Sequence, residues 1–569
     1  MDRLFETHFI RKCKTLDGAW DFTAEGKPER YKMPVPGCFE QHTDFLNFRG
    51  HVTYSREVTL TEPGNIRLMF KGVSHSGDVY WDGKQTAHHY NAFTPFAAVI
   101  PDVAAGFHTM NVNVDNTFGE HSALHVPNDY YTYGGITRPV SAEIVPDVYL
   151  KQIHFTPKYT GQAWQAEIEI TVENCSDRDI VCEVCACLNR DNRYAADSTE
   201  NLLDDAKPET ITVKSGEDKT VVIRGTCKAV EPWSHKNPAL YYLTAYLRVE
   251  GQLLDDLIDR VGFREIRVQG NRIYMNGEPI FVKGFNRHED YATVGCAMPL
   301  QLMMQDMDLM ENAGANAVRT CHYPNDERFL DLCDERGMLV WEENHARGFT
   351  LPRMQNPHFE EQCHDCIQEM IDNHYNHPAI FIWGILNECA SETPEGREMY
   401  SKQYAQIRAM DRTRPVTSAT CRHFTDICLD MPDVVSFNMY SGWYQDVDPA
   451  QRNQEELDWI EKAGGADKPI IVSEVGAAAL YGYRDRARCK WSEERQSDIL
   501  RENLEVYMTD PKISGLFVWQ FADCRVTEEE WFPTRARCHN NKGVVDEYRR
   551  PKEAYDTVKE VFHTYWTTT

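Results

Sequence analysis

Basic residues are scarce in this 569-residue chain compared with acidic ones. It has 60 Lys and Arg against 88 Asp and Glu, and its formal net charge at pH 7 is −28. A field of that sign repels phosphate backbones and anionic lipid surfaces, so the composition argues against nucleic acid or a membrane as a partner. A negatively charged substrate would need a local basic pocket to overcome the overall field.

Long apolar runs and a regular cysteine framework are also missing. No stretch approaches the roughly 20 apolar residues that a membrane-spanning helix needs, and residues 1–8 lack the apolar core of a secretion signal. The 18 cysteines follow no regular spacing, which favours a reducing, cytoplasmic location. We interpret the CxxC pairs Cys182/Cys185 and Cys363/Cys366 as unpaired thiols packed among apolar side chains rather than as a shared zinc site.

The first part of the chain is built from short alternating strands separated by Gly, Pro and Asn. Residues 1–147 have the rhythm of a β jelly roll, with patterns such as His51–Val58 and Thr109–Val114. The pattern restarts at Val148, and residues 148–262 fit an immunoglobulin-like β-sandwich. Neither segment contains a strong helical pattern.

After Gly262 apolar strands alternate with helical patterns. Eight such strands follow within roughly 300 residues, which predicts a (β/α)8 barrel over residues 263–569. The fifth unit is the weakest, because no clear helix separates Thr420 from Val434. The chain is therefore predicted to be a multidomain protein with a jelly roll, an immunoglobulin-like sandwich and a catalytic barrel.

Two of the predicted barrel strands end on a glutamate. The apolar runs Phe381–Asn387 and Pro469–Ser473 are followed by Glu388 and Glu474. Active sites of such barrels lie where the strands end, and a pair of carboxyl groups is the minimum equipment for cleaving a glycosidic bond. Asn387 offers an amide to the sugar hydroxyl beside the reacting carbon, so Glu388 is predicted as the acid/base and Glu474 as the nucleophile.

Longer motifs carry a resemblance to a known family. Residues 316–340, with the run Arg319-Thr-Cys-His322-Tyr-Pro, resemble the long signature of glycoside hydrolase family 2, and Gly384–Glu388 is similar to its acid/base motif. The resemblance extends to the order of the three domains. It implies a retaining mechanism, a homo-oligomer, and the same roles for Glu388 and Glu474.

A basic segment indicates which sugar is recognised. Residues 534–552 hold six Lys or Arg against two acids and follow the eighth strand, which places positive charge near the barrel mouth. Within it, Asn540-Asn-Lys542 resembles the Asn-x-Lys motif by which β-glucuronidases bind the sugar carboxylate. An arginine precedes that motif at a set distance in the subfamily, and here Arg535 and Arg537 stand on either side of that position.

The resemblance to the bacterial type of this subfamily implies further site residues. Asn438 and Tyr444 are expected on the substrate, Tyr440 beside the nucleophile, and Trp519 against the apolar face of the sugar. Asp129 is expected to reach the active site from the jelly roll. Two strand-end histidines, His288 and His322, are expected either to bond the substrate or to hold Asp290 and Glu343. The stretch after Glu343 is short, which predicts an open mouth.

These features predict a retaining exo-β-glucuronidase that acts on small-molecule or oligosaccharide β-glucuronides. No phosphate-binding loop or nucleotide fingerprint occurs in the sequence, and the reaction requires neither a cofactor nor a metal ion. A β-galacturonidase, a hybrid uronidase and a neutral β-galactosidase remain alternatives with the same chemistry. A non-catalytic carbohydrate-binding protein and a protein-binding scaffold are alternatives from other classes.

Overall fold

Two antiparallel sheets form the N-terminal part of the protein. A computed structural model describes residues 2–191, 201–227 and 229–565. One sheet has the order β3-β2-β4-β10-β7-β8, with bounds Tyr31–Val35, Gly18–Ala24, His51–Leu60, Gly106–Asp115, Ser76–Trp81 and Lys84–Tyr90. The other has the order β1-β12-β5-β9, with bounds Lys12–Thr15, Val140–Val145, Gly64–Phe70 and Phe96–Val103. The predicted jelly roll is confirmed.

A second antiparallel sandwich follows directly. Its three-stranded sheet has the order β13-β14-β17, with bounds Val148–Tyr159, Trp164–Asn174 and Asp218–Cys227. The facing sheet has the order β16-β15-β18-β19, with bounds Glu209–Val213, Ile180–Asn189, Tyr241–Val249 and Gln252–Val261. Alternate residues of β14 are buried, as expected for strands with one face on a core. The immunoglobulin-like sandwich is confirmed.

Eight parallel strands close into a barrel in the remainder of the chain. Their order is sequential, from β23 to β30, with bounds Val282–Asn286, Ala317–Thr320, Leu339–Glu343, Ile380–Asn387, Val416–Thr420, Val435–Met439, Ile470–Val475 and Ile513–Val518. All eight residues of β26 are buried, which is typical of parallel strands covered by helices on the outer face. The predicted barrel is confirmed, and residues 421–434 between β27 and β28 contain no helix.

Helices follow the barrel strands on the outside, as the sequence predicts for every unit except the fifth. They are α1, α2, α4, α5, α6, α7 and α8, with bounds Leu300–Asn312, Glu327–Arg336, Phe359–His374, Pro394–Met410, Pro449–Ile460, Glu493–Thr509 and Glu553–Thr564. The ends of α2 follow from its sequence. The Asp326 side chain accepts from the Arg328 N–H at 2.9 Å, and Gly337 adopts the left-handed conformation just past the helix.

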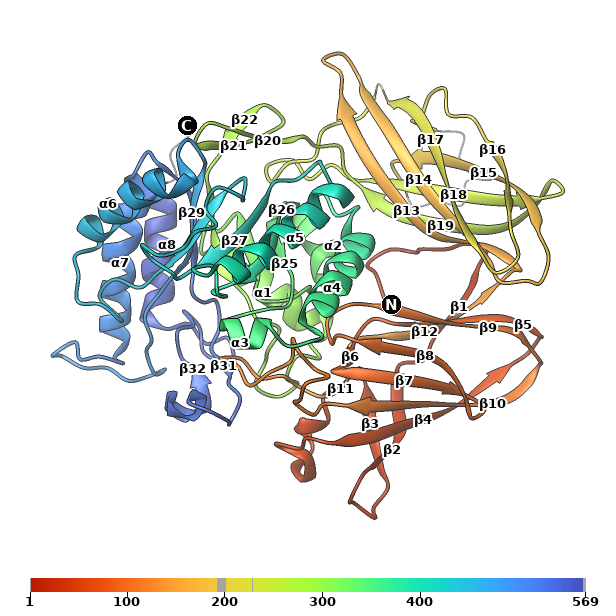
Figure 1. The fold of residues 1–569 in the computed structure, drawn as a ribbon, viewed down its shortest axis with the longest axis horizontal. Helices are drawn as coiled ribbons and strands as arrows, with labels where there is room; N and C mark the ends of the chain where they lie inside the picture. The colour runs from red at the N-terminus through yellow and green to blue at the C-terminus, as the bar shows by residue number, and fades with distance from the viewer. Residues whose placement is uncertain (1, 192–200, 228, 566–569) are drawn as a thin grey trace.

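Three separate hydrophobic cores match the three groups of elements. One lies between the N-terminal sheets, one between the sheets of the second sandwich, and the largest lies in and around the barrel. Figure 1 shows both sandwiches, in red to yellow, on the same side of the barrel, in green to blue. We propose that these cores define three domains, 1–147, 148–262 and 263–569.

Residues 116–134 form the loop between β10 and β11, and β11 has the bounds Gly135–Ile136. This loop links the jelly roll to the barrel mouth. The Tyr133 hydroxyl donates to Asp290 at 3.1 Å, and the Tyr130 hydroxyl lies 3.1 Å from Nε2 of His345. Just beyond the loop, buried Arg138 donates to Glu289 at 2.7 Å. These contacts fix the loop against the carboxyl ends of the barrel strands.

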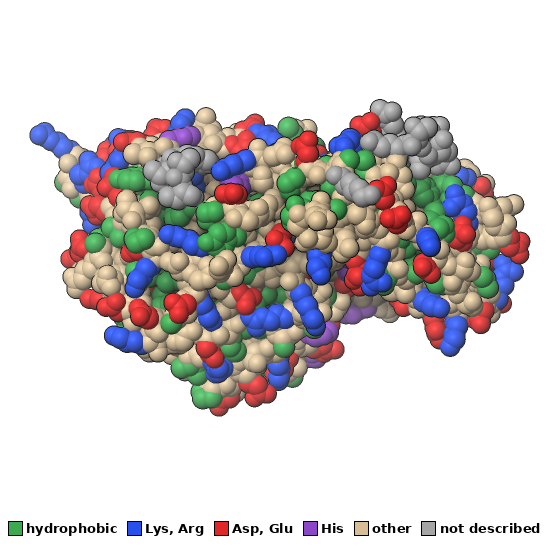
Figure 2. All heavy atoms as spheres, turned by 90° about the horizontal axis from the view of Figure 1, so that it is seen from above, with side chains coloured by type: hydrophobic (Ala, Val, Ile, Leu, Met, Phe, Trp, Pro, Cys, Tyr) green, Lys and Arg blue, Asp and Glu red, His purple; other side chains and the backbone are tan. Residues whose placement is uncertain are grey.

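Charge is distributed finely over the surface. Figure 2 shows acidic and basic side chains interspersed over one face of the molecule, so the net negative charge is not gathered into a single patch there. Among the helices of the described residues, none combines the length and apolar character needed to cross a membrane.

Asp306 on α1 compensates two buried guanidinium groups. It accepts from Nε of Arg287 at 2.9 Å and from Nε of Arg549 at 2.7 Å, and all three side chains are fully buried. The pairing connects the end of β23 to the segment before α8.

We expect Asp306→Ala to lower the free energy of unfolding by roughly 3 to 5 kcal/mol, because it leaves two buried cations uncompensated. Urea unfolding monitored by tryptophan fluorescence measures the change. The control is Asp308→Ala on the same helix, whose side chain is 64% exposed and pairs with Arg336. Equal unfolding midpoints for the two variants would contradict the role of Asp306.

Candidate active site

A cavity of about 300 Å³ opens at the carboxyl ends of the barrel strands. Its size is at the lower end of the range for small-ligand sites. Several of the predicted site residues line it, together with groups that the sequence did not single out: Asp129, Arg347, Glu388, Cys421, His423, Asn438, Met439, Tyr440, Tyr444, Gln445, Trp519, Trp531, Arg535 and Lys542.

Glu388 reaches this cavity from the residue after β26. Its backbone has φ 55°, a left-handed conformation that turns the chain sharply at the strand end, and its N–H donates to the Ala419 carbonyl at 2.8 Å. Nδ2 of Asn438 donates to the Glu388 carboxylate at 2.9 Å, and the Arg347 guanidinium lies 3.4 Å from it. Asn438, predicted on the substrate, therefore also orients Glu388.

Glu474 lies at the end of β29 in a more enclosed environment. The Tyr440 hydroxyl donates to one of its oxygens, as predicted for the residue beside the nucleophile, and Arg319 donates to the other at 3.2 Å. Burial raises the pKa of Glu474 to about 7, and the negative charge of Glu388 contributes to the increase.

Arg319 holds the ends of several strands together. Its guanidinium donates to both oxygens of Glu343 at 2.9 and 3.0 Å, and to the side-chain oxygens of Asn286 and Asn387 at 3.0 Å each. It is fully buried and also bonds Glu474. Burial raises the pKa of Glu343 to about 7 in spite of Arg319.

Lys542 supplies positive charge in the lining of the same cavity. It is 1% exposed, and no carboxylate of the described residues lies within ion-pair distance of its Nζ. Nζ instead lies 5.1 Å from the centre of the Tyr444 ring. Burial lowers the pKa of Lys542. Burial also acts to raise the pKa of Tyr444, but the charges of Lys542 and Arg535 outweigh that effect and lower it.

Asp129 comes from the jelly roll and lines the same cavity, as the sequence predicts. Arg535 donates to both of its oxygens, with Nε at 2.9 Å, and Nδ2 of Asn540 donates to it at 3.1 Å. Arg535 also donates to the Tyr444 hydroxyl at 3.3 Å. Arg537, by contrast, pairs with Glu547 away from the cavity. Arg535 is therefore the arginine that faces the site.

The basic segment contributes less charge to the site than its composition suggests. Arg549 pairs with Asp306, Arg550 with Asp546 and Lys552 with Asp523, at 2.6 to 2.8 Å. With Arg537 paired to Glu547, only Arg535 and Lys542 of the six basic residues reach the cavity. The other four serve the local fold, because each has a carboxylate partner and none lines the cavity, whereas Arg535 is paired with Asp129 and does line it.

Two amides keep an unused polar atom. Nδ2 of Asn387 and Oδ1 of Asn540 are buried and have no hydrogen-bond partner among the described residues. A buried polar atom without a partner is costly, so each is suited to a hydroxyl or another polar group of a ligand.

Trp519 and two histidines form an aromatic layer beneath the cavity. Trp519 lines the cavity and stacks on His322, with ring centres 5.1 Å apart, while His288 meets Trp519 edge-on at 5.5 Å. Nδ1 of His322 lies 2.7 Å from Glu343, as expected. Nδ1 of His288 lies 3.2 Å from the Tyr323 hydroxyl, whereas Asp290, its expected partner, accepts from Tyr133. Burial lowers the pKa of His288 to about 3.

Arg347 is the main residue that sequence reasoning missed. Its guanidinium lies between Glu388, at 3.4 Å, and Asp129, at 3.9 Å. It belongs to the short stretch after Glu343, whose length predicts an open mouth but does not indicate a basic site residue. A basic residue close after a strand-end glutamate was the available signal. Trp531, half-exposed at the mouth, was missed because it lies in an irregular acidic stretch.

Comparisons with known proteins agree with this geometry. The family model described as glycosyl hydrolases family 2, TIM barrel domain, matches residues 266–566, and the model described as glycosyl hydrolases family 2 matches residues 148–264. A β-glucuronidase of Streptococcus agalactiae is 27% identical over 97% of this chain and 96% of its own.

Two solved structures are similar over nearly the whole chain. A β-galacturonidase of Eisenbergiella tayi, bound to galacturonate, is 48% identical with a TM-score of 0.94 and covers 99% of each chain. A β-D-glucuronidase of Dictyoglomus thermophilum is 26% identical with a TM-score of 0.84, covering 99% of this chain and 98% of its own.

We expect Glu474→Gln to stabilise the protein at pH 8 by about 1 to 3 kcal/mol and to have little effect near pH 4. The carboxyl ionises near 4.5 when exposed and near 7 in the folded protein, so above pH 7 the fold carries a charge that burial disfavours. Urea unfolding at the two pH values measures this difference. Glu398→Gln, at a side chain 71% exposed, is the control. A Glu474→Gln protein less stable than wild type at pH 8 would contradict the assigned burial penalty.

Proposed function

Because this chain belongs to family 2 of the glycosyl hydrolases, we propose that it is a retaining exo-β-uronidase that hydrolyses β-D-glucuronides. The observation that carries the proposal is Lys542, a buried cation in the cavity that lacks a carboxylate partner among the described residues. A uronate substrate supplies that carboxylate. A neutral sugar leaves Lys542 desolvated and unpaired, which is costly.

The first step joins Glu474 to the anomeric carbon. The ionised carboxylate of Glu474 attacks that carbon, while Glu388 donates its proton to the glycosidic oxygen and the aglycone leaves as an alcohol. Tyr440 and Arg319, which donate to Glu474, stabilise the ionised form that attacks.

The second step releases the sugar. Glu388, now ionised, takes a proton from water, and the hydroxide oxygen displaces Glu474 from the anomeric carbon. The product is a β-uronic acid with retained configuration, and both carboxyl groups return to their starting protonation states. The hydrogen bond from Asn438 keeps Glu388 oriented in both steps.

The remaining contacts to the sugar are assigned from where each side chain lies in the site and from which groups it can bind. Lys542 and Asn540 hold the sugar carboxylate, Lys542 through its charge and Asn540 through Nδ2, which has a second N–H besides the one given to Asp129. The unused Oδ1 of Asn540 is an acceptor and suits a sugar hydroxyl. Nδ2 of Asn387 supports the 2-hydroxyl. Asp129, Asn438 and Tyr444 bind the ring hydroxyls of the sugar. Trp519 packs against its apolar face.

A β-galacturonidase is the second candidate, and one observation favours it. Identity to the galacturonidase structure is 48%, compared with 26 to 27% for the glucuronidases named above. The two uronates differ only in the orientation of the 4-hydroxyl, so the same carboxylate site and the same two glutamates serve either. Discrimination between them would come from the groups on the ring hydroxyls.

We also propose a cytoplasmic homo-oligomer. All eighteen cysteines are free thiols, which fits a reducing compartment. The expectation of an oligomer comes from the family resemblance.

Lys542→Ala should lower kcat/KM on 4-nitrophenyl β-glucuronide at least about 100-fold, because it removes a buried charge-assisted contact to the carboxylate. The same assay is run on the 4-nitrophenyl β-galacturonide and on the neutral 4-nitrophenyl β-galactoside, with the wild type and with the variant. Arg537→Ala, in the same segment but directed away from the cavity, is the control and should keep wild-type activity. The uronide proposal is wrong if the galactoside is the best substrate and its hydrolysis is unchanged in Lys542→Ala.

Glu388→Ala should lose activity most severely on substrates with poor leaving groups, because these require a proton donor. Added azide should restore turnover of an activated substrate and yield the β-glycosyl azide, since the small anion enters the space left by the side chain. NMR of the product establishes its configuration. An α-glycosyl azide as the product of Glu388→Ala would reverse the assigned roles of Glu388 and Glu474.

A further inference from the structure

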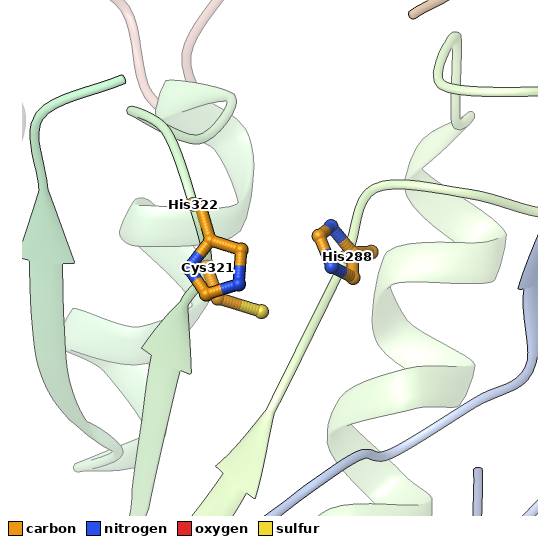
Figure 3. Close-up of side chains that lie close together, drawn as sticks. All are labelled: His288, Cys321 and His322. Carbon is orange, nitrogen blue, oxygen red and sulfur yellow. The ribbon is translucent and has the colours of Figure 1, made fainter. Parts of the chain in front are cut away.

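Three potential metal ligands converge beneath the active-site cavity. His288 follows β23, and Cys321 and His322 follow β24, the neighbouring strand. Figure 3 shows the thiol and the two imidazole rings gathered between these two strand ends. One ligand atom from each residue lies within 4.8 Å of the other two, and all three side chains are buried.

The two imidazoles leave the same nitrogen open. Nδ1 of His322 is engaged by Glu343 at 2.7 Å, and Nδ1 of His288 by the Tyr323 hydroxyl at 3.2 Å. Nε2 of each ring is buried and has no hydrogen-bond partner among the described residues. Metal-binding histidines have this arrangement, in which a partner on one nitrogen fixes the ring and leaves the other nitrogen free to ligate.

In the other groups of potential metal ligands among the described residues, a ligand atom is already paired with an arginine. In the group of His8, Cys13 and Glu143, the carboxylate is paired with Arg11 and Arg67.

The two remaining groups are also engaged. Asp255 is paired with Arg11, and Asp331 with Arg3. A cation would have to displace a guanidinium in each of these, but none from the ligand atoms of His288, Cys321 and His322.

We propose that Nε2 of His288, Nε2 of His322 and Sγ of Cys321 form a binding site for a thiophilic divalent cation such as zinc. Two nitrogens and one sulfur are a donor set that zinc prefers, and a small closure of the side chains brings them to its usual bond lengths of about 2.0 to 2.3 Å. The thiol releases its proton on binding.

Occupancy of this site blocks the nucleophile. Oε1 of Glu474 lies 4.0 Å from Nε2 of His322 and accepts from Arg319 at 3.2 Å, so a cation held there competes with Arg319 for the Glu474 carboxylate and takes it as a fourth ligand. The carboxylate then no longer attacks a substrate. This inhibitory effect rests on the proposed function, whereas cation binding does not.

Cobalt titration of the full-length, chelator-treated protein tests binding without an activity assay. One equivalent of Co²⁺ should produce a thiolate-to-cobalt absorption band in the near ultraviolet, and one equivalent of Zn²⁺ should abolish it. Cys321→Ser should lose the band. Cys13→Ser, which removes the thiol of the paired group described above, should retain it.

Activity measurements test whether a bound cation inhibits hydrolysis. One equivalent of Zn²⁺ should inhibit uronide hydrolysis by wild type reversibly, with recovery on adding EDTA, and Cys321→Ser should need at least tenfold more Zn²⁺. The absence of the cobalt band from wild type overturns the site, as does its persistence in Cys321→Ser. Full activity with the site occupied overturns the inhibitory effect. A protein without uronidase activity would refute the proposed function but leave the cobalt result valid.

Discussion

One buried guanidinium, that of Arg319, connects most of the active site. Its donors reach Asn286 on β23, Glu343 on β25, Asn387 on β26 and Glu474 on β29. A guanidinium without contact to water is stable only when carboxylates and hydrogen bonds compensate it fully. The charge of Arg319 thus forces two carboxylates and two amides to the same point at the barrel mouth. The chemistry that follows depends on that arrangement.

The two proposed catalytic carboxyl groups are distinguished by their surroundings. Glu474 is enclosed with Arg319 and Tyr440, whereas Glu388 faces the cavity and is oriented by Asn438. Burial raises the pKa of Glu474, while Arg319 and Tyr440 act against that rise and so favour the ionised form that a nucleophile needs. In the proposed function, Lys542 provides selection by charge in a protein whose net charge is −28. Because five of the six nearby basic residues have a carboxylate partner, this selection comes from an individual placed charge rather than from a broad basic surface.

The sequence predicts the barrel well because its strands are continuous apolar runs with the polar residue at the end, as in β26 and Glu388. It predicts Asp129 only through family resemblance, because nothing local links a jelly-roll loop to a barrel 406 residues away at Arg535. It could not distinguish Arg535 from Arg537, since the choice depends on the backbone turn between them. The role of Arg549 was equally hidden, because its partner Asp306 lies 243 residues earlier. Long-range pairing of charges therefore limits what the sequence can predict.

In the proposed mechanism, Glu474 forms the covalent bond to the sugar. Glu343 is the natural rival, because it is equally buried, has the same raised pKa of about 7 and shares Arg319. The most direct measurement is mass spectrometry of peptides from enzyme inactivated with a 2-deoxy-2-fluoro-β-uronosyl fluoride, which slows release of the glycosyl-enzyme. We expect one sugar per chain, attached to Glu474. A sugar attached to Glu343 or Glu388 would contradict it.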